Sequence, residues 1–313
     1  MIKLEQSQSH SKKLIALDNY LDEMIKLYEA DSFPKVLLLN GKKGIGKFTL
    51  TLHFINYLYS KKEKTRYNFY EKLINVNSNF YNSLINQNCS DVVFLRAEEG
   101  KNIKIEDIRN LKSTLSKSSL SSNPRFTIID EVEFLNVNSA NALLKTLEEP
   151  TKNNYFILIN NQQSDLIETI SSRCLKNNIY LNFAQRKKII DYLIQEKKIE
   201  LLINDNDNLS PGLLITFNEL FRKYKIDVNE NICLKLNKVL HGFKRDKDKA
   251  LISMSFFLID EFFFRLIKNN ENKIDFLLNI KSFITNKIND FIIYNTNINS
   301  VLSSIELKLK NVQ

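Results

Sequence analysis

Three of the six glycines in this chain fall within one short stretch, GKKGIGK at residues 41–47. Glycines at positions 41, 44 and 46 let backbone N–H groups close around phosphate oxygens, and Lys47 can reach the outer phosphates as a point charge. The stretch completes the pattern G-x-x-x-x-G-K and lies between an apolar run and a helical pattern. Gly41, Gly44, Gly46 and Lys47 therefore predict a phosphate-binding loop, here called the P-loop. The alternative is a plain glycine-rich connection between a strand and a helix.

The residue after the lysine departs from this pattern. Phe48 stands where a Ser or Thr hydroxyl would bind Mg²⁺, and Thr49 comes one position late. One residue on a helix is a rotation of about 100°, so Thr49 is not expected to replace that hydroxyl without rearrangement. We include Thr49 among the nucleotide-binding candidates, but the departure argues against metal-assisted phosphate chemistry.

An acidic pair, Asp130 and Glu131, ends the apolar run FTIIDE at residues 126–131. Asp130 at the end of such a strand can hold Mg²⁺ through water, and Glu131 beside it can polarise an attacking water molecule. By itself an Asp-Glu pair after a strand is more often a solvated turn. Its place downstream of a P-loop favours a nucleotide site.

The third candidate is Arg173, in the segment SSRC at residues 171–174. A lone arginine is usually a surface charge or a salt-bridge partner. An arginine offered to the γ-phosphate of a neighbouring subunit would instead stabilise transition-state charge in trans, as an arginine finger does.

The elements that must position these residues alternate between strand and helix. Strand patterns alternating with helical ones over about 180 residues predict an α/β domain with a parallel, doubly wound sheet. We expect strands at 36–40, 91–97, 125–131 and 155–161, and helices at 11–30, 48–60, 105–118 and 139–149. Asn136 and Asn138 are available to cap the last of these helices and Pro150 ends it. Residues 61–90 show no clear periodicity.

Beyond residue 183 the pattern is helical, without a convincing strand. We therefore predict three domains. They are an α/β domain at 1–183, a small helical lid at 184–212 and a helical C-terminal domain at 213–313.

Composition limits the class of protein. The chain has 313 residues and a net charge of +9, and its three cysteines are far apart, which argues against a disulfide scaffold and a cysteine-built zinc site. The start lacks the apolar core of a signal peptide, and Asp260 and Glu261 interrupt the most apolar helical stretch, so we expect a cytoplasmic protein without membrane spans. The net positive charge permits sequence-independent DNA binding as one interpretation of function, but a dispersed, solvated distribution of the charge over the surface is favoured.

Three segments together resemble the AAA+ clamp-loader subunits, and within them the delta-prime group of bacterial DNA polymerase III. NSANALLKTLEEP (138–150) is very similar to a signature of that family, and SFPKVLLLNGKKGIGKFTL (32–50) is similar to the alphaproteobacterial form of its P-loop segment. TISSRC (169–174) resembles the arginine-finger motif of the family. The resemblance covers about residues 10–215, and the remainder is similar only in being helical.

The resemblance implies an AAA+ P-loop domain, a helical lid and a C-terminal collar in a pentameric ring. The implied partners are motor (tau/gamma) subunits and a delta subunit, and the ring uses ATP to load a sliding clamp onto primed DNA. Delta-prime subunits are the rigid stator of that ring. Arg173 would complete the ATP site of an adjacent motor, and residues 41–47 would form a vestigial or binding-only site for ATP or ADP.

Three departures from the family pattern bear on this expectation. Phe48 removes the hydroxyl, and SPGLL (210–214) resembles the sensor-2 segment with Leu213 where an active motor has Arg. Both argue against ATP hydrolysis. The four-cysteine zinc module of many relatives is absent, because its region offers only Cys89, so no zinc or other metal site is expected. The alternative is a catalytically competent ATPase motor of the same family, which the retained Asp130 and Glu131 favour.

Overall fold

The computed structural model describes residues 11–86, 88–96, 102–116, 123–151, 153–203, 209–269 and 273–310. The chain divides into two compact units. The first comprises Met1–Glu200 and Asp205–Leu214, and the second comprises Leu201–Asn204 and Ile215–Gln313.

The first unit is built on a five-stranded parallel sheet. The strands are β1 (Val36–Asn40), β2 (Val92–Arg96), β3 (Arg125–Asp130), β4 (Asn154–Asn160) and β5 (Leu175–Asn178), in the order β2-β3-β4-β1-β5. Because all five run in the same direction, their carboxyl ends share one edge of the sheet, here called the carboxyl edge. A row of amides follows this edge: Asn40 accepts a hydrogen bond from Asn160 Nδ2 (2.8 Å) and donates one to Asn178 Oδ1 (2.7 Å).

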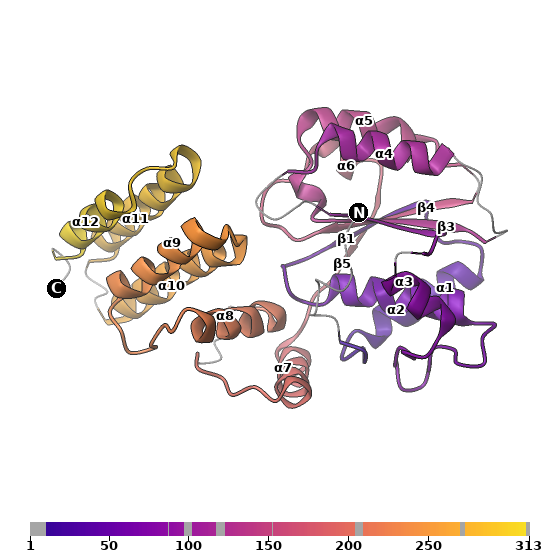
Figure 1. Cartoon of the computed structure of the whole chain (residues 1–313), viewed down its shortest axis with the longest axis horizontal. Coiled ribbons are helices and arrows are strands. Elements are labelled where there is room, and N and C mark those ends of the chain that lie inside the picture. The colour runs from indigo at the N-terminus through magenta and orange to yellow at the C-terminus, as the bar shows by residue number, and fades with distance from the viewer. Residues whose placement is uncertain are drawn as a thin grey trace. The chain divides into compact units, whose positions relative to one another are not determined.

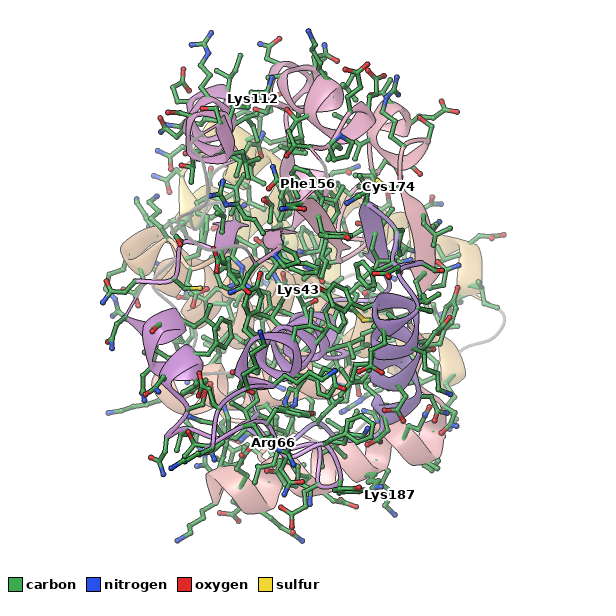
Figure 2. The ribbon with its side chains drawn as sticks, turned by 90° about the vertical axis from the view of Figure 1, so that its right-hand side faces the viewer. Lys43, Arg66, Lys112, Phe156, Cys174 and Lys187 are labelled. Carbon is green, nitrogen blue, oxygen red and sulfur yellow. The ribbon has the colours of Figure 1, made fainter. Side chains whose placement is uncertain are left out.

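Helices cover both faces of this sheet (Figure 1). The layer on one face consists of α1 (Asp18–Glu29), α2 (Lys47–Ser60) and α3 (Asn79–Ile85), and the layer on the other of α4 (Ile105–Ser116), α5 (Val137–Glu148) and α6 (Glu168–Ser171). Side chains of β1 alternate between the layers, with Leu37 and Leu39 in the core beside α1 and α2 and Leu38 in the core beside α4 and α5. Figure 2 shows Phe156 of β4 beneath the second layer, with Lys112 above it on α4. Burial on both faces explains why the strands are continuous apolar runs.

The four strands predicted from the sequence are confirmed to within a residue or two, and so are the helices at 48–60, 105–118 and 139–149. Asn136 caps α5 by accepting a hydrogen bond from Ser139 N at 2.8 Å. The helix expected at 11–30 is shorter, because Ala16 has a left-handed backbone (φ 61°) and α1 begins at Asp18. In the unassigned stretch 61–90, Ser78 caps α3.

One strand was not predicted. The sequence of β5, LKNN, is polar and mostly exposed, and nothing in it favours a strand. It pairs with β1 along its whole length, from Leu175 opposite Leu37 to Asn178 opposite Asn40. The strand therefore forms because β1 offers it a hydrogen-bonding edge, which is tertiary context overriding local propensity.

The remaining described elements are all helical. They are α7 (Phe183–Lys197), α8 (Pro211–Lys223), α9 (Ile232–Asp246), α10 (Lys249–Asn269), α11 (Ile274–Tyr294) and α12 (Ile298–Leu309). The core of the second unit contains side chains from α9 to α12, among them Leu240, Phe263, Ile284 and Ile305. A lid at 184–212 and a collar at 213–313 stay a prediction. Among the described helices, none combines the length and hydropathy needed to cross a bilayer.

The buried histidine of α2 generates a prediction about pH. His53 has no exposed surface, its Nδ1 lies 2.9 Å from Tyr67 Oη and its Nε2 lies 3.3 Å from Ser11 O. Because a carbonyl only accepts, Nε2 carries the proton and Nδ1 accepts from the tyrosine hydroxyl. Burial lowers the pKa of His53 from 6.5 to about 4.

As the pH falls below 6.5, His53 is protonated in the unfolded chain but stays neutral in the folded chain until about pH 4. The folded state therefore loses stability between these two pH values. Between pH 7.5 and 5 the free energy of unfolding is expected to fall by about 2 kcal/mol from this group. Urea unfolding followed by circular dichroism at the two pH values measures the loss. The same loss in His53→Gln would show that another group causes it.

Candidate functional site

The P-loop connects the carboxyl end of β1 to the first turn of α2. Gly44 and Gly46 have left-handed backbones (φ 81° and 102°), a conformation in which successive N–H groups form an anion-binding concavity. Lys47 Nζ donates to Gly41 O at 2.6 Å and to Lys42 O at 2.7 Å, so the ammonium ties the ends of the loop together. Burial lowers the pKa of Lys47 to about 8, against the opposing effect of the nearby Asp130 carboxylate. The loop has the shape and charge of a phosphate site.

The segment before and at the start of α8 docks directly on this loop. Gly212 N donates to Gly44 O at 2.9 Å, and Ser210 Oγ donates to Lys43 O at 2.5 Å. A Cβ on Gly44 would lie 2.4 Å from Ser210 Oγ, and one on Gly212 would lie 2.8 Å from Gly44 O. Both glycines are therefore required by a backbone-to-backbone contact. Sequence reasoning gave Gly44 a phosphate role alone and missed this contact, although the SPGLL segment was identified.

Asp130 ends β3 and is almost completely buried, with 3% of its surface exposed. Its Oδ2 accepts from Arg96 Nε at 2.8 Å and also pairs with Arg96 Nη2. Its Oδ1 accepts from Glu131 N at 2.9 Å and from Asn161 Nδ2 at 3.2 Å. The hydrogen-bonding capacity of the carboxylate is thus used by four protein donors.

Phe48 lies beside this pair. Its ring centroid is 5.0 Å from the guanidinium carbon of Arg96 and 5.8 Å from the ring centroid of Phe94. Mg²⁺ requires oxygen ligands in near-octahedral geometry. Here a ring replaces the hydroxyl, and the carboxylate of Asp130 is paired with a guanidinium. The residues at this point therefore do not fit a magnesium ion.

Glu131 is also committed to a protein partner. It follows β3 with a left-handed backbone (φ 57°), and its Oε1 lies 3.0 Å from Lys43 Nζ of the P-loop. The same ammonium donates to Gln163 Oε1 at 3.3 Å. This ion pair connects the P-loop to the loop after β3, in place of a carboxylate open to water.

Sequence reasoning missed several residues at the carboxyl edge, above all Arg96, Lys43, Glu133 and Asn161. Glu133 is buried, accepts from Asn161 N at 3.0 and 3.2 Å, and has its pKa raised by burial. Among them, Arg96 had a usable sequence signal. It lies one residue before the end of a predicted strand, as Asp130 does in another, and the ends of adjacent parallel strands meet.

Of the residues named from the sequence, all but one gather at or near this edge. They are Gly41, Gly44, Gly46, Lys47, Asp130 and Glu131, together with Thr49, half-buried on the first turn of α2. Within the part of the chain that the structure describes, no group of three or more His, Cys, Asp and Glu side chains is placed to hold a metal ion.

Arg173 lies at the opposite edge of the sheet. It precedes β5, whose Leu175 pairs with Leu37 near the start of β1, whereas the P-loop follows the end of β1. Four residues of strand, roughly 13 Å, separate the two positions along the sheet. Arg173 Nε donates to Glu148 Oε1 at 2.6 Å and Nη1 donates to Thr169 O at 2.8 Å, with 31% of the side chain exposed. Arg173 therefore cannot reach the P-loop of its own chain.

Comparison with known proteins identifies the family of this chain. A family model described as DNA polymerase III, delta subunit, matches residues 17–182. The DNA polymerase III subunit delta' of Bacillus subtilis (strain 168) is 32% identical over 263 residues, which is 80% of this chain and 71% of the relative. The chain belongs to the delta-prime family of DNA polymerase III subunits.

Two further matches are to other DNA polymerase III proteins. The DNA polymerase III subunit tau of Escherichia coli (strain K12) is 32% identical over 109 residues, 34% of this chain and 17% of tau. A crystal structure of a DNA polymerase III gamma-subunit-related protein from Thermotoga maritima matches with a TM-score of 0.52 and 19% identity, covering 93% of this chain and 100% of that one. The structural match shows the fold alone, which is that of AAA+ P-loop proteins.

The contact between the two glycines can be tested by Gly212→Ala. The added methyl group would meet the backbone of Gly44, and overpacking of this kind costs about 1–3 kcal/mol. We expect faster hydrogen exchange at residues 210–214 and in the P-loop, and lower stability, although alanine favours a helix more than glycine does. Exchange followed by mass spectrometry measures this, and unchanged protection would contradict a tight contact.

Proposed function

We propose that this chain is the stator of a bacterial clamp loader, a delta-prime subunit that does not hydrolyse ATP. Its proposed partners are the motor (tau/gamma) subunits and the delta subunit, and through the complex the sliding clamp and primed DNA. The observation that carries the proposal is the commitment of both acidic residues of the P-loop site to protein cations: Asp130 pairs with Arg96, and Glu131 pairs with Lys43. Because replication takes place in the bacterial cytoplasm, we place the protein there.

These ion pairs favour the stator over the alternative, an active motor of the same family. A motor needs an acidic residue to position metal and another to polarise water. Here Asp130 has no remaining acceptor capacity and Glu131 is held 3.0 Å from an ammonium. Leu213, where an active motor has Arg, offers no charge to a nucleotide. The P-loop itself keeps its glycine geometry and Lys47, which supports binding of ATP or ADP without turnover.

The position of Arg173 supports a role toward a neighbouring subunit. Arg173 lies at the edge of the sheet opposite the carboxyl edge, away from the chain's own P-loop, and its guanidinium is partly exposed there. Glu148 at the end of α5 orients the side chain of Arg173 by accepting a hydrogen bond from Arg173 Nε, and Thr169 O accepts one from Arg173 Nη1. We propose that Arg173 completes the ATP site of an adjacent motor subunit, with Glu148 as a positioning residue.

Basic side chains also gather in the second unit. A hollow of about 530 Å³ at the end of α8 and on α9 is lined by Lys223, Lys225, Lys238, Lys244 and Arg245. Their charge is partly balanced, because Glu230 pairs with Lys238, and Asp246 pairs with Lys223 and Arg245. Direct DNA binding by this chain remains the prediction of an alternative interpretation, which tight, strongly salt-dependent binding by the isolated chain would favour.

Reconstitution tests the proposed role of Arg173. The chain is mixed with motor and delta subunits, and ATPase stimulated by clamp and primed DNA is recorded for the wild type and for Arg173→Ala. Because one arginine finger serves one site of several, we expect the ring to assemble and its turnover to fall by roughly two-fold or more. Glu148→Gln should lower turnover less.

Arg109→Ala is the matched control, since Arg109 is exposed on α4. Failure of the ring to assemble would contradict the stator role. Assembly with full turnover in Arg173→Ala would contradict only the trans arginine.

The isolated chain is expected to show no ATP turnover above background, because neither acidic residue is available for hydrolysis. A sensitive phosphate-release assay at saturating ATP and Mg²⁺ measures this. Turnover on the order of one per second that disappears in Lys47→Ala would instead establish an active motor.

A further inference from the structure

The side chain of Arg96 lies between Asp130 and Phe48, which occupy the two positions that would supply metal ligands in a magnesium-binding P-loop site. On one side its Nε and Nη2 contact the carboxylate of Asp130, and on the other its guanidinium carbon lies 5.0 Å from the ring centroid of Phe48. Phe48 follows the P-loop lysine, where a hydroxyl would bind Mg²⁺, and Asp130 is the strand-end carboxylate that would hold the same ion. One guanidinium therefore contacts both positions.

The residue types at these positions suit a guanidinium better than a metal. A carboxylate accepts charge-assisted N–H bonds from arginine, here from Nε and Nη2 on the same oxygen, Oδ2 of Asp130. An aromatic ring attracts a cation to its face, whereas it offers Mg²⁺ no ligand. The register of the sheet fixes the position of Arg96 next to Asp130, because the two are directly paired residues of β2 and β3. The loss of the hydroxyl at position 48 and the presence of arginine at position 96 are thus two parts of one arrangement.

The guanidinium also keeps capacity for a ligand. Its contacts with Asp130 use Nε and Nη2, and Nη1 makes no hydrogen bond within the described residues. The side chain of Arg96 is 28% exposed, while that of Asp130 is 4% exposed. The solvent-exposed member of this ion pair is therefore the guanidinium of Arg96, which lies on the same carboxyl edge as the P-loop.

We propose that Arg96 takes the place of magnesium at this P-loop, so that the loop binds the phosphates of a nucleotide as a metal-free anion. The inference rests on the binding-only P-loop of the proposed function and specifies the form of its ligand. A guanidinium supplies positive charge and N–H donors. It cannot generate hydroxide from a bound water as a metal ion does, which agrees with binding without hydrolysis.

Calorimetric titration of the full chain with ADP, in EDTA and then in Mg²⁺, tests this directly. We expect ADP to bind in EDTA, and Mg²⁺ to leave the Kd unchanged or to raise it by competing for free ADP. Binding that is about tenfold or more tighter in Mg²⁺ would overturn the proposal. No binding of ADP at millimolar concentration in EDTA would overturn it as well.

The double variant Arg96→Ala, Phe48→Thr tests the role of the arginine. It removes the guanidinium and restores a hydroxyl, so affinity for ADP in EDTA should fall by about tenfold. With Mn²⁺ and ADP it should show a bound-metal signal in electron paramagnetic resonance that the wild type lacks. Arg109→Ala, the control, should behave as the wild type in both measurements.

A folded double variant with unchanged affinity in EDTA, or without the bound-Mn²⁺ signal, contradicts the proposal, as does a bound-Mn²⁺ signal in the wild type. Should the variant not fold, the wild-type titration still decides. Ring assembly and the effect of Arg173→Ala do not depend on these results, so this inference can fail while the stator role stands.

Discussion

The buried carboxylate of Asp130 imposes the constraint on which this part of the carboxyl edge depends. A carboxylate with 3% of its surface exposed cannot remain charged in a protein interior without a cation and a full set of hydrogen bonds. In this chain the cation is Arg96, delivered by the adjacent strand in direct register. The ring of Phe48 then packs against the guanidinium, and the side chain of Asn161 and the N–H of Glu131 fill the remaining acceptor positions. The arrangement of Arg96, Phe48, Asn161 and the Glu131 backbone follows from satisfying this one charge.

The polarity of the parallel sheet separates the two roles that we propose for this chain. All strands end at the edge that carries the P-loop, and Arg173 precedes the last of them at the other edge. A head-to-tail ring joins different surfaces of successive subunits, so residues at opposite edges of one domain can serve two different interfaces. The proposed division between a binding-only site and an arginine offered in trans requires this separation.

The contact between Gly44 and Gly212 connects the P-loop to the helical segment that follows the sheet domain. Two backbones approach closely enough that neither residue has room for a Cβ. Such a contact leaves little freedom for the segment to move relative to the loop while the hydrogen bond from Gly212 N persists. A rigid connection at this point suits the stator role proposed for the chain, since a motor must change conformation with its nucleotide.

The sequence by itself determined the glycine-rich loop between strand and helix, four of the five strands, and the helices α2, α4 and α5, because each depends on a local pattern of apolar residues, glycines and caps. It also placed Asp130 at the end of a strand. It did not determine α3 or the start of α1. Only the tertiary structure decided β5, whose polar residues become a strand through the free edge of β1. It likewise decided the partners of Asp130 and Glu131 and the contact of Gly44 with Gly212. Arg96 is 34 residues from Asp130, and Gly212 is more than 160 residues from Gly44. Contacts between residues so far apart in the chain leave no local pattern in a single sequence, because folding alone brings them together.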